Sequence, residues 1–143
     1  MKSGIPSTQW PLIVADATAS TPAILQLADS WIGVPYVFGG CSRRGVDCSC
    51  LVQLVYQSAG VRLPRTAAEQ NTVTTRVSRD QLQPGDLVFF VNTYMPGISH
   101  VGIYIGGGQQ INAPDEGQTV SIQPVFDGYW GAHYIGAGRV IRS

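Results

Sequence analysis

The chain has 143 residues, of which 44% are hydrophobic and 13% are charged, and nine basic residues balance nine acidic ones. This length is typical of one domain with its own core, and the composition is that of a globular protein rather than a disordered one. Because no basic cluster is longer than Arg43-Arg44, the sequence argues against a nucleic-acid-binding protein. The longest apolar runs, such as 87–91, are too short to cross a membrane.

The first twenty residues are rich in small polar side chains, and we expect residues 1–20 to form an irregular arm laid across the surface. The apolar stretch 12–15 is too short for the hydrophobic segment of a secretory signal. We therefore expect either release from the cytoplasm by another route or excision from a longer protein. Residues 21–143 form the predicted single domain.

Three helices are predicted in the first half of the chain. Thr21-Pro22 is typical of an N-cap followed by proline at the first helical position. The second helix contains the apolar run 51–59 and is stopped by Gly60. Thr66-x-x-Glu69 is a capping box that opens a short third helix.

The second half of the chain changes to the alternating pattern of β-strands, with Gly, Pro and Asp between the segments. Helices followed by an antiparallel sheet of about five strands give an α+β layout. The predicted strands are Leu87–Val91, Ile98–Ile105, Gln109–Asn112, Thr119–Gln123 and Tyr134–Ile141.

Cys48 is the main candidate for a catalytic residue. It stands where a glycine-rich loop gives way to the second helix, and the partial positive charge at a helix N-terminus stabilises a thiolate. His100 lies in a predicted strand, and Asn112 follows just past Gly106-Gly107-Gly108. A cysteine that opens a helix, with histidine and asparagine on neighbouring strands, is the arrangement of a papain-like nucleophile, base and orienting residue.

The predicted hairpin around the three glycines brings the last two residues together. A three-residue loop would place Asn112 opposite Gly102, on the same face as His100 and diagonal to it. A loop with an even number of residues would turn Asn112 to the opposite face, so this inference depends on the turn.

The other cysteines give weaker signals. Cys41, Cys48 and Cys50 match none of the common zinc-ligand spacings, so no metal site is expected, and a disulfide scaffold is not expected at this size. Cys41 is interpreted as structural or incidental. Two helical residues are about 200° apart, so Cys50 should point away from Cys48 and matter for packing rather than for chemistry.

Six motifs in order resemble the NlpC-type cell-wall cysteine endopeptidases, a compact branch of the papain-like superfamily. The resemblance runs from about Leu25 to Val140, and it departs from the family pattern at Cys50, where glycine is usual. The motifs are Pro35-Tyr36-Val37-Phe38-Gly39-Gly40, Asp47-Cys48-Ser49, Leu63-Pro64-Arg65 with Gln70, Pro84-Gly85-Asp86-Leu87, His100-Val101-Gly102-Ile103-Tyr104, and Asn112.

The resemblance implies a papain-like fold, no cofactor, and Cys48, His100 and Asn112 as nucleophile, base and orienting residue. The family hydrolyses peptidoglycan stem peptides, typically between γ-linked D-glutamate and a diamino acid. Tyr36, Asp47, Ser49 and Arg65 are the expected substrate-binding residues, and Asp47 can also be a helix N-cap. The expected protein is a monomer acting on the cell wall, encoded by a phage, delivered as an effector, or part of a larger phage or secreted assembly.

Two alternatives remain open from the sequence. One is a papain-like amidase or acyltransferase that acts on another amide or on a lipid ester. The other is a catalytically degenerate module that binds the cell wall or builds a phage tail. The sequence also leaves open whether Tyr129 and Trp130 wall the cleft or fill the core, and His133 is expected at the surface or in packing.

Overall fold

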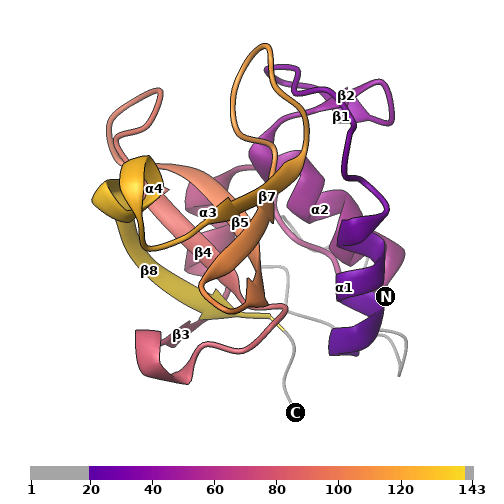
Figure 1. Cartoon of the computed structure of the whole chain (residues 1–143). Helices are drawn as coiled ribbons and strands as arrows, with labels where there is room; N and C mark the ends of the chain where they lie inside the picture. The colour runs from indigo at the N-terminus through magenta and orange to yellow at the C-terminus, as the bar shows by residue number, and fades with distance from the viewer. Residues whose placement is uncertain (1–19, 141–143) are drawn as a thin grey trace.

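The computed structural model describes residues 20–140 and shows two helices packed on one side of a sheet, with a third on the other side (Figure 1). The paired helices are α1 (Thr21–Asp29) and α2 (Cys48–Ser58), and α4 (Gly128–His133) lies across the sheet from them. A short helix, α3 (Ala67–Thr72), and a 3-10 turn at Arg79–Gln81 connect the two halves. Within the described part of the chain, no helix is long and apolar enough to cross a membrane.

The main sheet has six strands in the order β3-β8-β4-β5-β6-β7, and each neighbouring pair is antiparallel. The α+β layout is therefore confirmed, with one strand more than the sequence suggested. The additional strand, β3, has only three residues and two of them are exposed, so it lacks a readable alternation. The strands are β3 (Thr75–Val77), β4 (Leu87–Val91), β5 (Ile98–Gly106), β6 (Gln109–Asn112), β7 (Ser121–Pro124) and β8 (Tyr134–Arg139), and a separate small hairpin joins β1 (Cys41–Ser42) to β2 (Gly45–Val46).

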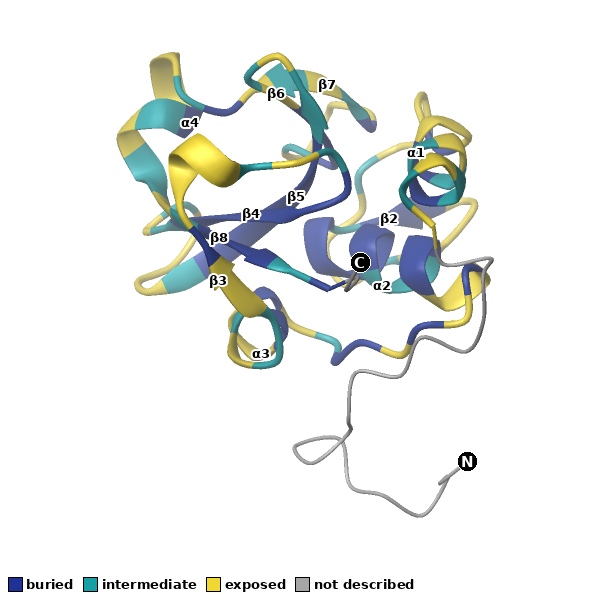
Figure 2. Ribbon diagram, turned by 90° about the horizontal axis from the view of Figure 1, so that it is seen from below, coloured by how far each residue is buried: buried dark blue, intermediate teal, exposed yellow. Residues whose placement is uncertain are grey.

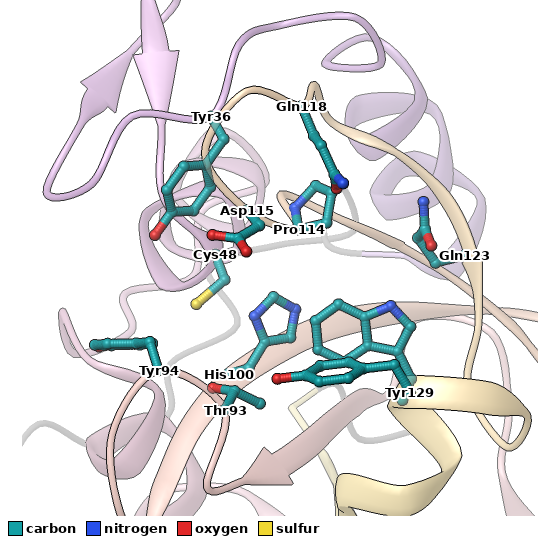
Figure 3. A pocket seen from close by; sticks show the side chains of 11 residues that line it. Tyr36, Cys48, Thr93, Tyr94, His100, Pro114, Asp115, Gln118, Gln123 and Tyr129 are labelled. Carbon is teal, nitrogen blue, oxygen red and sulfur yellow. The ribbon is translucent and has the colours of Figure 1, made fainter.

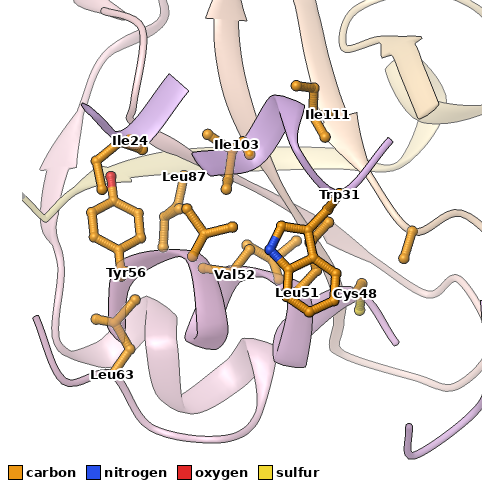
Figure 4. Packing of buried hydrophobic residues seen from close by; sticks show 14 of the residues in the cluster. Ile24, Trp31, Cys48, Leu51, Val52, Tyr56, Leu63, Leu87, Ile103 and Ile111 are labelled. Carbon is orange, nitrogen blue, oxygen red and sulfur yellow. The ribbon is translucent and has the colours of Figure 1, made fainter. Parts of the chain in front are cut away.

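The two faces of the sheet carry separate apolar clusters. Along β4, Leu87 and Phe89 point toward α1 and α2, whereas Val88 and Phe90 point toward α4. This alternation is the ordinary geometry of a strand that is buried on both faces. The larger cluster fills the space between the sheet and the two helices (Figure 4), and buried residues are continuous through α2, β4 and β5 (Figure 2).

The helix boundaries follow their capping residues. The side chain of Ser20, rather than the predicted Thr21, caps α1 by accepting a hydrogen bond from the amide of Ala23. The capping box of α3 is confirmed, because Thr66 and Glu69 each accept a hydrogen bond from the other's backbone amide. Helix α4 was not predicted, since two glycines among its six residues hide the helical pattern.

A disulfide between Cys41 and Cys50 gives Cys41 a structural role, one of the two alternatives expected for it, and corrects the interpretation of Cys50 as a packing residue only. Cys50 does point away from Cys48, as expected from the helix, but it points toward the β1–β2 hairpin. The Cα atoms are 5.4 Å apart, and the bond closes a short segment, with a sequence separation of nine between the two cysteines. The spacing rules for zinc sites and for multi-disulfide scaffolds did not cover a single bond of this kind. The predicted arm, apart from Ser20, lies outside the described residues.

Candidate active site

Cys48 is the first residue of α2, and its N-cap is Asp47. The Asp47 carboxylate accepts a hydrogen bond from the amide of Cys50 at 2.9 Å, which fixes the first turn of the helix. The side chain of Gln70 donates to the carbonyl oxygens of Ser49 and Pro64, at 3.0 and 2.9 Å. The start of α2 is therefore anchored by its own cap and by α3.

The thiol of Cys48 lies against the first part of strand β5, which does not pair with β6. The register of β5 with β6 extends from Ile103 to Gly106, so the preceding part of β5 is not paired with β6. The Sγ atom of Cys48 lies 3.9 Å from the carbonyl oxygen of Ser99, next to His100. This meeting of a helix N-terminus and a strand edge brings together residues 52 positions apart in sequence.

His100 and Asn112 form a buried pair on one face of the sheet, as the hairpin analysis predicted. The side-chain nitrogen of Asn112 is 3.1 Å from Nε2 of His100, and both residues are buried. For Nδ1 to accept a proton from the thiol, Nε2 must carry a hydrogen, and the amide oxygen of Asn112 is the acceptor it needs. That oxygen has no other partner, so turning the amide over places it on Nε2.

The turn that sets this register differs from the prediction. Only Gly107 and Gly108 lie between the strands, and a bulge between Tyr104 and Gly106 absorbs the remaining residue. The pairing of Ile103 with Ile111 then places Asn112 opposite Gly102, as a three-residue loop would have done. A Cβ atom at Gly102 would collide with Oε1 of Gln110 and lie 3.3 Å from Cβ of Asn112, so a larger residue there would displace the buried Gln110 side chain and crowd Asn112.

Aromatic side chains hold the imidazole from behind. The indole of Trp130 stacks on the His100 ring, with centroids 4.2 Å apart and an interplanar angle of 26°, and Phe90 meets the ring edge-on at 5.6 Å. Trp130 therefore walls the cleft rather than only filling the core. The sequence could not assign this role, because α4, which carries the residue, was not predicted.

Burial sets the protonation of the thiol and the imidazole. It raises the pKa of the Cys48 thiol to about 12, an increase that the Asp47 carboxylate enhances and that backbone amides and Arg65 oppose. Burial also lowers the pKa of His100 to about 3. The position of Cys48 at a helix N-terminus predicted a lowered thiol pKa, but desolvation outweighs the effect of the helix here. At neutral pH the resting site therefore holds a neutral thiol and a neutral imidazole.

Two hollows meet at Cys48 and form one cleft, since both are lined by Tyr36, Cys48 and Tyr94. The histidine-side hollow, of about 330 Å³, also contains His100 and Trp130 (Figure 3). The helix-side hollow, of about 380 Å³, lies over the start of α2 and contains Asp47, Ser49 and Arg65 along with Phe38, Gly39, Thr66, Ala67, Ala68, Met95, Ile98 and Ser99.

The polar residues of the helix-side hollow form one connected group. Arg65 donates to both carboxylate oxygens of Asp47, at 2.8 and 3.1 Å, and to the hydroxyl of Ser49 at 2.8 Å. This bidentate pair is partly exposed, with side-chain exposures of 37% for Arg65 and 15% for Asp47. The predicted double role of Asp47 is compatible with the geometry, because its carboxylate caps the helix and also faces the cleft.

Tyr36 lines both hollows and so borders the point where they meet at Cys48. Burial, with the neighbouring Cys48 and Asp47 adding to it, raises the pKa of the Tyr36 hydroxyl above its ordinary value. The hydroxyl thus remains a hydrogen-bond donor throughout the physiological range. The backbone amide of Tyr36 donates to the carbonyl of Gln118 at 2.9 Å, which ties this loop to the segment before β7.

The remaining histidine does not line either hollow. The Nδ1 atom of His133 is 2.7 Å from the carbonyl oxygen of Val91, and its ring lies against Tyr129, which itself borders the histidine-side hollow. Among residues 20–140, no group of three His, Cys, Asp or Glu side chains is arranged to hold a metal ion. Several cleft residues were not predicted, because they come from loops or from the edge strand β7 and belong to no motif. They are Thr93, Tyr94, Pro114, Asp115, Gln118 and Gln123.

The fold and the Cys–His–Asn geometry place the chain in the papain-like class of proteins. Comparisons with known proteins identify the family within that class. Residues 33–139 match the NlpC/P60 family. The gamma-DL-glutamyl hydrolase of Bacillus subtilis (strain 168) is 47% identical over 130 residues, which cover 89% of this chain and 31% of that protein. The murein DD-endopeptidase MepH of Escherichia coli (strain K12) is 42% identical over 114 residues, covering 77% of this chain and 42% of that protein.

Solved structures of NlpC/P60 proteins are also similar to this chain. An NlpC/P60 family protein from Bacillus cereus ATCC 10987 superposes with a TM-score of 0.81 at 31% identity, covering 86% of this chain and 41% of that one. The NlpC/p60 domain of the peptidoglycan hydrolase SagA superposes with a TM-score of 0.72 at 36% identity, covering 83% of this chain and 97% of that domain. The chain belongs to the NlpC/P60 family. It spans less than half the length of the two curated relatives described above.

Proposed function

We propose that this chain is a cysteine endopeptidase that hydrolyses peptide bonds in peptidoglycan stem peptides. The observation that carries the proposal is the position of Cys48, at the centre of a two-ended cleft and beside the buried His100–Asn112 pair. Such a cleft suits an extended chain whose scissile bond lies over the thiol. The curated relatives' names, gamma-DL-glutamyl hydrolase and murein DD-endopeptidase, support a peptide substrate of the cell wall.

The geometry supports a two-step mechanism. His100 takes the proton of the Cys48 thiol as Sγ attacks the scissile carbonyl carbon, and the carbonyl oxygen becomes an oxyanion. The backbone amide of Cys48 and the hydroxyl of Tyr36 donate hydrogen bonds to that oxyanion. His100 then passes its proton to the departing amine, which leaves an acyl group on Cys48. A water molecule, deprotonated by the same imidazole, hydrolyses the thioester and restores the thiol.

Asn112 acts in this mechanism as a positioning residue. Its amide holds the imidazole so that Nδ1 stays available to the thiol, and Trp130 fixes the plane of the ring. The reaction uses a neutral thiol and a neutral imidazole, so the ion pair forms only as the nucleophile attacks. No step requires a cofactor.

We further propose that the substrate has a γ-D-glutamyl residue before the scissile bond and a diamino acid after it. In this proposal Asp47, Ser49 and Arg65 bind the acyl half of the substrate from the helix-side hollow. The polar character of these three residues argues against a lipid ester as substrate. The intact Cys48–His100–Asn112 arrangement argues against a degenerate binding module.

The proposed place of action is the cell wall, outside the cytoplasm. The Cys41–Cys50 disulfide supports this proposal, because such bonds persist in oxidising compartments. This place of action is compatible with a phage enzyme, with a delivered effector and with the catalytic part of a secreted protein. We propose that the domain acts as a monomer, since one chain supplies all three members of the proposed catalytic group, Cys48, His100 and Asn112.

Digestion of purified peptidoglycan tests the proposal. Sacculi are incubated with the wild-type protein and with Cys48→Ala, and the released material is identified by mass spectrometry. From the wild type alone we expect soluble peptides that begin at the diamino acid, with L-Ala-γ-D-Glu and its new glutamyl carboxyl terminus left on the glycan. Release of the same fragments by Cys48→Ala, or no release by the wild type, would reject the assignment.

A further inference from the structure

The histidine-side hollow has an unbalanced charge. Of its lining residues only Asp115 carries a carboxylate, and none is lysine or arginine. The helix-side hollow differs, because its carboxylate, Asp47, is already paired with Arg65. The two ends of the cleft therefore present different chemistry to a substrate, and only the histidine side offers an unpaired negative charge.

The mechanism determines which half of the substrate each end receives. The departing amine must lie within reach of the proton on His100, and His100 lines only the histidine-side hollow. The residue that follows the scissile bond consequently enters this hollow, together with its side chain. The acyl half extends over the start of α2.

Asp115 is held in place close to the catalytic pair. It follows Asn112 by three residues, and the intervening Ala113 is fully buried. One carboxylate oxygen accepts a hydrogen bond from the amide of Glu116 at 2.7 Å, and the carbonyl of Asp115 accepts one from the amide of Gln118 at 3.1 Å. The carboxylate lines the hollow and lies on the side where Cys48 and His100 lie (Figure 3).

Two side-chain amides extend the polar character of this end. Gln118 and Gln123 line the hollow with Asp115, and the nitrogen of Gln123 donates to the hydroxyl of Ser121 at 2.9 Å. The carbonyl oxygen of that amide remains as a further acceptor. A carboxylate with amide oxygens nearby is suited to an ammonium group, which has three donors and no acceptor.

We propose that Asp115 is a specificity residue that binds the side-chain ammonium of the residue following the scissile bond. This inference rests on the proposed function and names the group by which the enzyme selects a diamino acid over a neutral residue. Because Asp115 is exposed, the pair is partly screened by solvent, and its contribution falls as salt is added.

The test compares two tripeptides that differ only in the ammonium group, L-Ala-γ-D-Glu-L-Lys and its L-norleucine analogue. The preference is the ratio of their kcat/KM values, measured for the wild type, Asp115→Asn and Glu116→Gln. Glu116 is the matched control, since it is an exposed neighbouring acid that does not line the hollow. We expect the wild type to prefer lysine about fivefold to tenfold, mainly through KM, and Asp115→Asn to lose that preference. Glu116→Gln should retain it.

Binding to Cys48→Ala separates this inference from the proposed activity. The affinities of both tripeptides are measured by calorimetry for that variant and for its double variant with Asp115→Asn. A preference for lysine that vanishes with Asp115→Asn supports the ammonium site even if the wild type hydrolyses neither peptide, a result that would reject only the proposed function. Equal affinities for the two peptides, or a lysine preference that survives Asp115→Asn, would overturn the inference.

Discussion

A buried thiol and a buried imidazole keep their neutral forms over a wider pH range than the same groups in water. Burial raises the pKa of Cys48 to about 12 and lowers the pKa of His100 to about 3. The imidazole therefore stays unprotonated as the pH falls below its ordinary value, and the thiol stays protonated as the pH rises above its own. Both groups need those forms for the proposed proton transfer.

The pH dependence of kcat/KM follows from these two shifts. We expect a level profile between about pH 5 and pH 9, with the acid limb below the ordinary histidine range and no alkaline limb from Cys48 in that window. Thiolate absorbance near 240 nm, corrected with Cys48→Ala, should stay absent at neutral pH. A bell-shaped profile inside that window, with thiolate visible at pH 7, would show a preformed ion pair instead.

At the scale of elements, the position of the catalytic pair depends on a turn and a bulge that compensate each other. The sequence identified His100, Gly102 and Asn112 as neighbours on one face, and the register confirms it. It counted the loop differently, because a bulge at Ile105 leaves no distinct pattern among apolar residues and glycines. The strands with clear alternation were predictable, whereas the three-residue β3 and the glycine-containing α4 were not.

The Cys41–Cys50 disulfide links two of these elements. It fastens the β1–β2 hairpin, at the end of the glycine-rich loop that begins with Tyr36, to the first turn of α2. Sequence reasoning treated Cys50 as a larger substitute for glycine, since spacing alone does not reveal that the hairpin folds back onto the helix. The bond is formed close to Cys48 in sequence but does not include it, and Cys48 is the free cysteine.

Removal of the disulfide should lower stability. For Cys41→Ser we expect a loss of about 2.5 kcal/mol in the free energy of unfolding, the loop-closure value for a segment of this length. Denaturant unfolding of wild type and variant, each with and without a phosphine reductant, measures it. With reductant the two proteins should unfold alike. Equal stability of the two without reductant, or three titratable thiols in the denatured wild type, would contradict the bond.

At the scale of the whole molecule, the active site joins two halves of the chain that sequence reasoning treated separately. The helical half contributes Cys48, and the sheet contributes His100 and Asn112. Residue identities and the family resemblance were enough to nominate these three. On the helix side, the predicted residues Tyr36, Asp47, Ser49 and Arg65 do line the cleft. The walls on the histidine side were mostly not predictable, because Trp130, Tyr94 and Asp115 reach the cleft from a short helix and from loops whose positions depend on tertiary packing.

The central claim is that Cys48 carries the acyl group during turnover, and mass spectrometry of the quenched enzyme tests it most directly. The wild type is mixed with L-Ala-γ-D-Glu-p-nitroanilide, quenched in acid within the first turnover, and digested for peptide mapping. We predict an added L-Ala-γ-D-Glu group on the peptide that contains Cys48, with one p-nitroaniline released per acyl group formed, and neither signal from Cys48→Ala. Release of p-nitroaniline by Cys48→Ala at the wild-type rate, or an acyl group on another residue, would contradict the claim.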